Sequence, residues 1–191
     1  MNKKLAAAVS GSAVLMLVLA GCGGDEGDKK ANAWAKQVCD KWQPELKKIE
    51  KANADIKRVS GESSKPDDVQ KTDSAAFQSQ ADAYKAMSAA VAQAGVPPTK
   101  DGQATKDAAV KGFDSASKAY TDLKAKIDAL DPKDQSKFAD GLKEMAGAIS
   151  QAQKGSADAY DQLKKAGLDQ AMNSQKGCKV TVVAPSASPA K

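Results

Sequence analysis

Apolar residues recur at helical spacing in four successive stretches of the chain. The clearest stretch covers residues 103–130, where intervals of three and four residues alternate between its apolar positions. Such intervals place side chains on one helix face and are typical of the seam between packed helices. The seam residues of this stretch are Phe113, Ala116, Tyr120, Leu123, Ile127 and Leu130.

The two preceding stretches also predict helices. The first covers residues 31–59 and contains Pro44, which removes a main-chain hydrogen bond, so we expect a kink or a restart there. The second begins at Pro66 and ends at Gly95. Proline suits the first turn of a helix and glycine the residue that follows the last turn, so both ends of the second helix are well marked.

The fourth stretch follows the third almost at once. Asp131 and Pro132 lie between them, and the apolar pattern then continues from Phe138 to about Met172. A connection this short forces two helices to run antiparallel. We therefore predict an all-α fold, an up-down-up-down antiparallel four-helix bundle, followed by a short extended piece at residues 180–183.

The N-terminus has the features of an export signal. Lys3 and Lys4 precede an apolar stretch from Leu5 to Leu19, and the stretch closes on the sequence L-A-G-C, which ends at Cys22. This ending resembles the lipobox of bacterial lipoproteins. The alternative is an ordinary secretory signal in which the cysteine falls by chance.

The resemblance implies a specific modification. Cys22 would receive a thioether-linked diacylglycerol, signal peptidase II would cut after Gly21, and Cys22 would become the first mature residue. Two acyl chains give stable anchoring at about 0.8 kcal/mol for each buried methylene. We expect residues 1–21 to be the signal peptide, residues 22–30 a lipidated cysteine and flexible tether, residues 31–183 the bundle domain and residues 184–191 a disordered tail.

Two cysteines remain, Cys39 and Cys178. Exported proteins usually pair such cysteines, and no C-x-x-C spacing points to redox chemistry. The start of the first helix and the end of the fourth lie at the same end of an up-down-up-down bundle, which would bring the two residues together. We predict that a disulfide between them closes the bundle.

The amino-acid composition restricts the classes of function that we expect. Alanine accounts for nearly half of the 41% hydrophobic residues, aromatic residues are only 4%, and histidine is absent. A core this thin argues against a large enzyme, and the commonest acid–base group and metal ligand is missing. We expect no metal, no cofactor and no enzymatic activity.

The net charge and the kind of basic residue restrict the classes of binding partner that we expect. The whole chain carries +5, and loss of Lys3 and Lys4 with the signal leaves 27 basic against 24 acidic residues, or +3. Arg58 is the only arginine, whereas nucleic-acid readers depend on arginine, so we expect no nucleic acid. Besides the membrane, the expected partners are an envelope protein or an anionic wall polymer.

Two motifs suggest chemistry. Ser115 and Lys118 fit S-x-x-K, but the other elements of penicillin-binding proteins are missing, so we interpret the match as chance. Tyrosines follow alanine once on each of the last three helices and could form a ligand platform with the tryptophans, although aromatic residues at helical spacing are more often core. These residues are Trp34, Trp42, Tyr84, Tyr120 and Tyr160.

The expected function follows from the anchor and the bundle. In composition and layout the domain resembles the small secreted lipoproteins of high-GC Gram-positive bacteria. We expect a protein held by lipid at the outer face of the cell membrane, with a binding or structural role and a ligand-binding surface that the sequence does not locate. The alternative is a carrier or sensor of a small apolar ligand within the bundle, and a filled core would argue against it. A binding module should show a patch of exposed aromatic or apolar residues, and a uniformly charged surface would count against that role.

Overall fold

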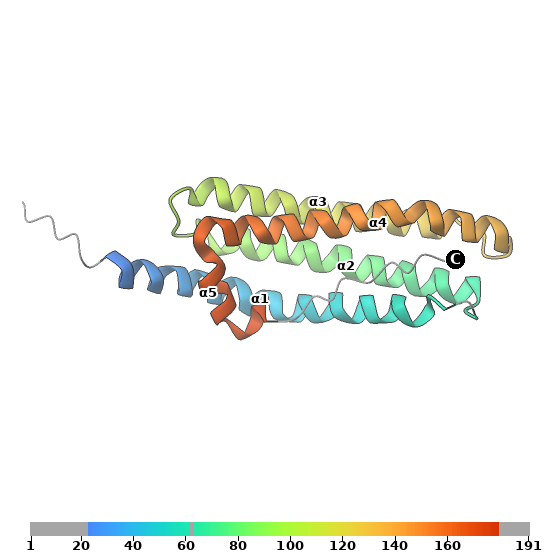
Figure 1. The fold of residues 1–191 in the computed structure, drawn as a ribbon, viewed down its shortest axis with the longest axis horizontal. Coiled ribbons are helices and arrows are strands. Elements are labelled where there is room, and N and C mark those ends of the chain that lie inside the picture. Colours follow the sequence, from blue (N-terminus) through green and yellow to red (C-terminus); the bar gives the residue numbers. More distant parts are fainter. Residues whose placement is uncertain (1–22, 62, 180–191) are drawn as a thin grey trace, which may run out of the picture.

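The computed structural model describes residues 23–61 and 63–179, which form an all-α bundle of four long helices (Figure 1). The described residues contain no strand. The long helices are α1 (Gly23–Val59), α2 (Pro66–Ala94), α3 (Gly102–Asp128) and α4 (Gln135–Leu163). Each packs antiparallel on the one before it, which confirms the predicted up-down-up-down bundle.

The boundaries of α2 follow from local chemistry, as predicted. Pro66 occupies the first turn, and Gly95 ends the helix with a φ of 80°, a left-handed conformation that glycine adopts without steric cost. The connection to α3 then folds tightly, because Gly102 lies directly against the carbonyl oxygen of Pro97. A side chain at Gly102 would not fit there.

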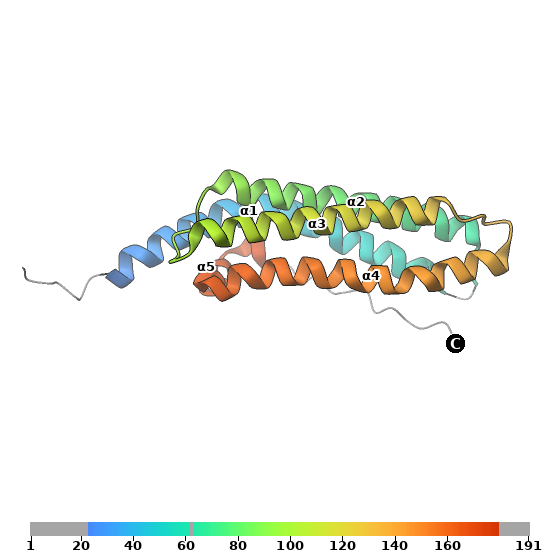
Figure 2. The same ribbon diagram turned by 90° about the horizontal axis from the view of Figure 1, so that it is seen from above.

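Helix α1 differs from the prediction at its start. The polar segment expected to be a flexible tether is helical from Gly23 onwards, and the first turns of α1 project beyond the other helices in both views (Figures 1 and 2). Glu26 and Lys30 form an i,i+4 ion pair, with 2.8 Å between Oε1 and Nζ. Once the buried Trp34 and the residues after it have formed a helix, adding turns at its end costs little free energy.

Helix α1 also runs through Pro44 without a break, so the predicted restart is wrong. Pro44 lies on the solvent face, as does Asp40, whose main-chain carbonyl loses its usual helical partner and can bond to water. Trp42 and Leu46 on the opposite face are buried. Their packing holds the helix together across the proline.

The C-terminal part of the fold also departs from the prediction. The fourth helix was expected to continue to about Met172, but it ends at Leu163 and passes into a π-helical turn, η1 (Lys164–Leu168). Gly167 has a φ of 92°, which reverses the chain. The short helices α5 (Asp169–Ser174) and η2 (Lys176–Cys178) then pack on α1 and tie the end of the bundle to its beginning (Figure 1).

The core is filled by large side chains from all four long helices. The Trp42 ring meets Phe113 edge to face at 5.2 Å between centroids, and its indole nitrogen donates to the carbonyl oxygen of Met87. The largest fully buried side chains run the length of the bundle. They include Trp42, Phe77, Phe113, Ile49, Leu123, Ile127, Leu163, Leu168 and Met172.

Candidate functional site

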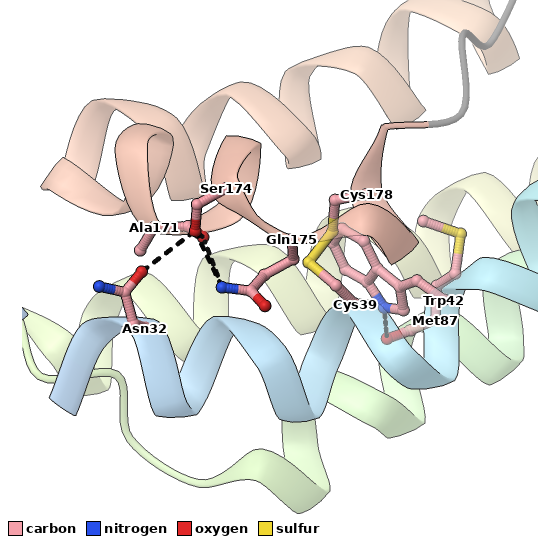
Figure 3. The surroundings of a disulfide bond; sticks show 8 residues. All are labelled: Asn32, Cys39, Trp42, Met87, Ala171, Ser174, Gln175 and Cys178. Atoms are coloured by element: carbon pink, nitrogen blue, oxygen red, sulfur yellow. Dashed lines mark hydrogen bonds between the residues drawn. A yellow bond between two sulfur atoms is a disulfide. The ribbon is translucent and has the colours of Figure 1, made fainter. Parts of the chain in front are cut away.

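The predicted disulfide between Cys39 and Cys178 is present. The two Cα atoms lie 5.1 Å apart although 139 residues separate them in the sequence (Figure 3). Gly177 allows the close approach, since a side chain there would collide with the main-chain carbonyl of Cys39. Cys39 is fully buried, which fits a structural bond rather than an exchanging thiol.

Polar contacts hold the same junction together. The Ser174 hydroxyl donates to Oδ1 of Asn32 at 3.2 Å, and the Gln175 side-chain amide donates to the carbonyl oxygen of Ala171 at 3.2 Å (Figure 3). The first bond connects α5 to the first part of α1, and the second stabilises the end of α5 itself. The junction therefore has a structural explanation and offers no evident binding site.

The aromatic residues form core rather than a ligand platform. Tyr84 and Tyr120 stack on one another, with 5.4 Å between ring centroids, and both are buried. Trp34 and Trp42 are buried as well, and Tyr160 is half-buried against Trp42. This confirms the interpretation of the aromatic residues as core.

A polar layer crosses the middle of this core. The Gln80 amide donates to Oδ1 of Asn53 at 2.6 Å, and the Tyr84 hydroxyl is hydrogen-bonded to the hydroxyls of Tyr120 and Ser156. Burial raises the pKa of both tyrosines. Hydrogen bonds of this kind between polar groups set the register between helices, and Ser156 alone of these residues is partly exposed.

Asp73 is the one acidic side chain that is buried among the described residues, and, like Gln80, it has a buried oxygen without a hydrogen-bond partner. Burial raises the pKa of its carboxyl group to about 7, and its Oδ1 atom has no hydrogen-bond partner among the described residues. A buried carboxylate without a partner destabilises the charged form. No nucleophile or base accompanies Asp73 in the polar layer, so we expect its raised pKa to affect the stability of the fold and not a reaction.

The S-x-x-K match lies on the surface of α3. Ser115 and Lys118 are both exposed, and Nζ of Lys118 lies 2.8 Å from a carboxylate oxygen of Asp122. A base must be hydrogen-bonded to the nucleophile that it activates, whereas Lys118 is paired with Asp122 on the next turn. The geometry supports the interpretation as a chance match.

Two hollows open on the surface of the described part of the chain. The first, of about 410 Å³, lies between α1 and α2, and the second, of about 450 Å³, lies along α3. The second is lined by two lysines and two aspartates and is electrically balanced. The first, here called the cationic groove, is lined by Lys48, Lys51, Ala52, Asp55, Arg58, Lys71, Thr72, Ala75, Ala76 and Ser79.

The cationic groove is the strongest candidate site. Four of its lining side chains are basic and only Asp55 is acidic. The sequence singled out Arg58 only for its rarity and missed the groove, because its residues come from two helices. The groove could have been found by working out from the heptad register which face of α1 meets which face of α2.

The remaining surface is charged. Among the described residues, Val96 is the single large hydrophobic side chain that is exposed, at 53%. Within the same residues, no group of three or more acidic or cysteine side chains could hold a metal ion. No described helix is both long and apolar enough to span a membrane.

Comparisons with known proteins give no family. The chain matches no protein-family model, no curated protein and no solved structure. Cys22 lies outside the described residues, so its lipidation remains a prediction from the sequence.

Proposed function

We propose that this protein is held by lipid at the outer face of the cell membrane and acts there by binding or structural contact, without catalysis. The observation that carries the proposal is the junction between the L-A-G-C sequence and the first helix. Cys22 ends the predicted lipobox, and α1 begins at the very next residue, Gly23.

The start of α1 would act as a rigid stalk between the lipid on Cys22 and the bundle. Helix α1 has 37 residues and would be about 55 Å long at about 1.5 Å per residue. With lipid on Cys22, the projecting first turns would lift the bundle away from the membrane surface. The turn between α1 and α2 would then lie at the end of the bundle farthest from the membrane.

The core argues against the carrier alternative. The central layers are occupied by the fully buried rings of Trp42, Phe77 and Phe113, and the two hollows are open to solvent and lined mostly by charged and hydroxyl-bearing residues. A small apolar ligand would have to displace packed side chains, which costs several kcal/mol of packing free energy, about 3–5 kcal/mol for a large aromatic residue. We therefore do not propose a carrier function.

The surface also restricts the mode of binding. A single exposed Val96 does not form an apolar docking patch. The apolar patch expected of a binding module is therefore not found among the described residues, and the role that we propose relies on contacts through charged and polar side chains.

Fractionation of the producing cells tests the anchoring. The wild-type chain should partition with membranes, and the mass of its N-terminal peptide should show a modified Cys22. Cys22→Ala should appear in the soluble fraction or the medium. An unmodified Cys22 in the mature protein, or unchanged membrane retention of Cys22→Ala, would refute the proposal.

The same experiment needs a control for folding. Cys39→Ala changes a cysteine that takes no part in the proposed anchoring, and its product should stay with the membrane if it escapes degradation. Release of both variants would mean that misfolding, and not loss of lipid, removes the protein from the membrane.

A further inference from the structure

The cationic groove has more positive charge than its own acidic residues can neutralise. Lys51 and Arg58 share one carboxylate, since Asp55 accepts from Lys51 and lies 3.5 Å from Nη2 of Arg58. These two neighbours, Lys51 more than Arg58, hold the pKa of Asp55 below its usual value. One of the two cations is therefore in excess.

Lys71 adds to this excess. It forms no ion pair within the described residues, and Asp67 and Asp68, one turn earlier on α2, are not among the residues that line the groove. Lys48, the fourth cation, pairs with Glu45 at 2.9 Å and is neutralised by it. The groove thus presents about two positive charges that no ion pair neutralises.

The second hollow, along α3, is balanced by comparison. Two lysines and two aspartates line it, and one of these lysines, Lys118, also pairs with Asp122. The fields of paired charges largely cancel, so they attract an approaching anion only weakly. Lysines without an ion pair occur elsewhere on the described surface, as at Lys143, but the cationic groove differs in that four cations and one carboxylate line a single hollow.

The floor of the groove lets a ligand come close to the helices. Ala52 and Ala76 are buried there and Ala75 lies beside them, so no bulky side chain fills the space between α1 and α2. Thr72 and Ser79 add hydroxyl groups that can donate to an oxyanion. Arg58 presents a planar fork of donors that matches the oxygen geometry of phosphate.

The cations are spread along the groove and do not converge on one point. From Lys48 to Arg58 the groove follows α1 for about 15 Å at about 1.5 Å per residue. A single small anion could reach only one or two of these side chains, whereas a chain with several anionic groups could contact all of them. No aromatic residue lines the groove, so it lacks the stacking surface that single-stranded nucleic acid uses.

We propose that the cationic groove between α1 and α2 binds a flexible polymer that carries repeated phosphate groups. Arg58, Lys51 and Lys71 contact successive phosphates, and Thr72 and Ser79 donate hydrogen bonds to their oxygens. The binding itself goes beyond the proposed anchoring and does not depend on it. If Cys22 is lipidated, the groove lies near the end of the bundle farthest from the membrane, where a polymer outside the headgroup layer is within reach.

Binding of defined polyanions at low salt tests the proposal. The complete chain is purified from whichever fraction holds it and titrated with short linear polyphosphate, with poly-glutamate, with oligothymidylate and with inorganic phosphate. Polyphosphate should bind with the highest affinity, and its affinity should fall steeply as salt is added. Poly-glutamate or oligothymidylate binding as tightly as polyphosphate would refute the assignment, as would equal occupancy by inorganic phosphate at the same phosphate concentration.

Two double variants with the same change of net charge test the location. Arg58→Gln/Lys71→Gln removes two cations of the groove, and Lys118→Gln/Lys154→Gln removes two from α3 and α4. The groove variant should weaken polyphosphate binding by roughly tenfold or more, since it removes two charge-assisted contacts to phosphate groups. The control variant should change it by roughly twofold or less.

Equal losses in the two double variants would mean that net charge alone attracts the polymer, and would refute the proposal. Circular dichroism checks that both variants are folded. Amide chemical shifts of the wild-type protein give a second measurement: residues 48–58 and 71–79 should move on addition of polyphosphate, and shifts elsewhere alone would also refute it. Cys22→Ala should bind as the wild type does, so failure of the anchoring proposal leaves this result intact.

Discussion

Gly112 on α3 packs directly against Ala159 on α4. A Cβ atom added at Gly112 would lie 2.6 Å from the Ala159 Cβ atom and 3.3 Å from its Cα atom. Because the obstacle includes main chain, it cannot move aside as a flexible side chain could. The pair fixes how closely α3 and α4 approach.

Gly112→Ala should therefore destabilise the protein despite the higher helix propensity of alanine. We expect a loss of about 1–3 kcal/mol in the free energy of unfolding, since overpacking forces the helices apart. Urea unfolding followed by circular dichroism measures it. Gly147→Ala is the matched control: Gly147 is exposed within α4 and has open space around it, so alanine should stabilise by about 0.5–1 kcal/mol.

Removal of the disulfide should have a larger effect. Cys39→Ala/Cys178→Ala opens a loop whose ends lie 139 residues apart in sequence, and the chain-entropy model gives a loss of about 4–5 kcal/mol. Urea unfolding of the variant and of the oxidised wild type measures the difference. A change below about 1 kcal/mol would mean that α5 and η2 hold their place on α1 without the bond.

Asp73 should make the protein less stable at neutral pH than in mild acid. Its pKa is about 7 in the folded protein against an ordinary value of 3.8, so the folded state holds the proton more tightly. The contribution is fully present below about pH 4 and is lost as pH rises through about 7. Asp73→Asn should thus be more stable than the wild type by about 2–4 kcal/mol at pH 8 and similar to it near pH 4.

Unfolding of both proteins at the two pH values measures this effect. Asp82→Asn, which changes an exposed aspartate of the same helix, controls for the altered net charge. An advantage of Asp73→Asn that is the same at both pH values would contradict the role of the buried carboxylate.

The Trp42 indole should contribute more than the Trp34 indole to stability. Both nitrogens donate over 3.1 Å to main-chain carbonyls, Trp42 to Met87 in the buried core and Trp34 to Gly95 at a partly buried position. Trp42→Phe leaves a buried acceptor with one bond fewer and should cost about 1–3 kcal/mol, whereas water can replace the bond lost in Trp34→Phe. Thermal unfolding of the two variants ranks them, and a greater loss for Trp34→Phe would contradict the expectation.

Short-range chemistry explains which parts of the fold were predictable. Pro66 and Gly95 act on their own backbone and on the turn beside them, so the limits of α2 could be predicted from the residues themselves. The seam from Phe113 to Ile127 repeats at helical intervals, and all its members proved buried. The partnership of Cys39 and Cys178 followed from the bundle topology and the small number of cysteines.

The errors occurred where a distant contact decides a local conformation. Pro44 usually interrupts a helix, but the packing of Trp42 and Leu46 keeps α1 continuous through it. Gly147 and Gly167 are the same residue type in different tertiary surroundings. Helix α4 continues through the exposed Gly147, whereas the chain reverses at Gly167 so that α5 can reach α1. No local pattern distinguishes these cases.

The amino-acid sequence sufficed for the helix content, the order of the helices and the disulfide, because each rests on periodicity, on local backbone preference or on the pairing of few cysteines; the lipid site at Cys22 stays a prediction from a short motif. Only the tertiary structure revealed the projecting first turns of α1, the buried Asp73 and the cationic groove. Each of these depends on which faces of helices far apart in the chain meet, and on which charges that meeting leaves without a partner. Burial and electrostatic balance are properties of the assembled bundle.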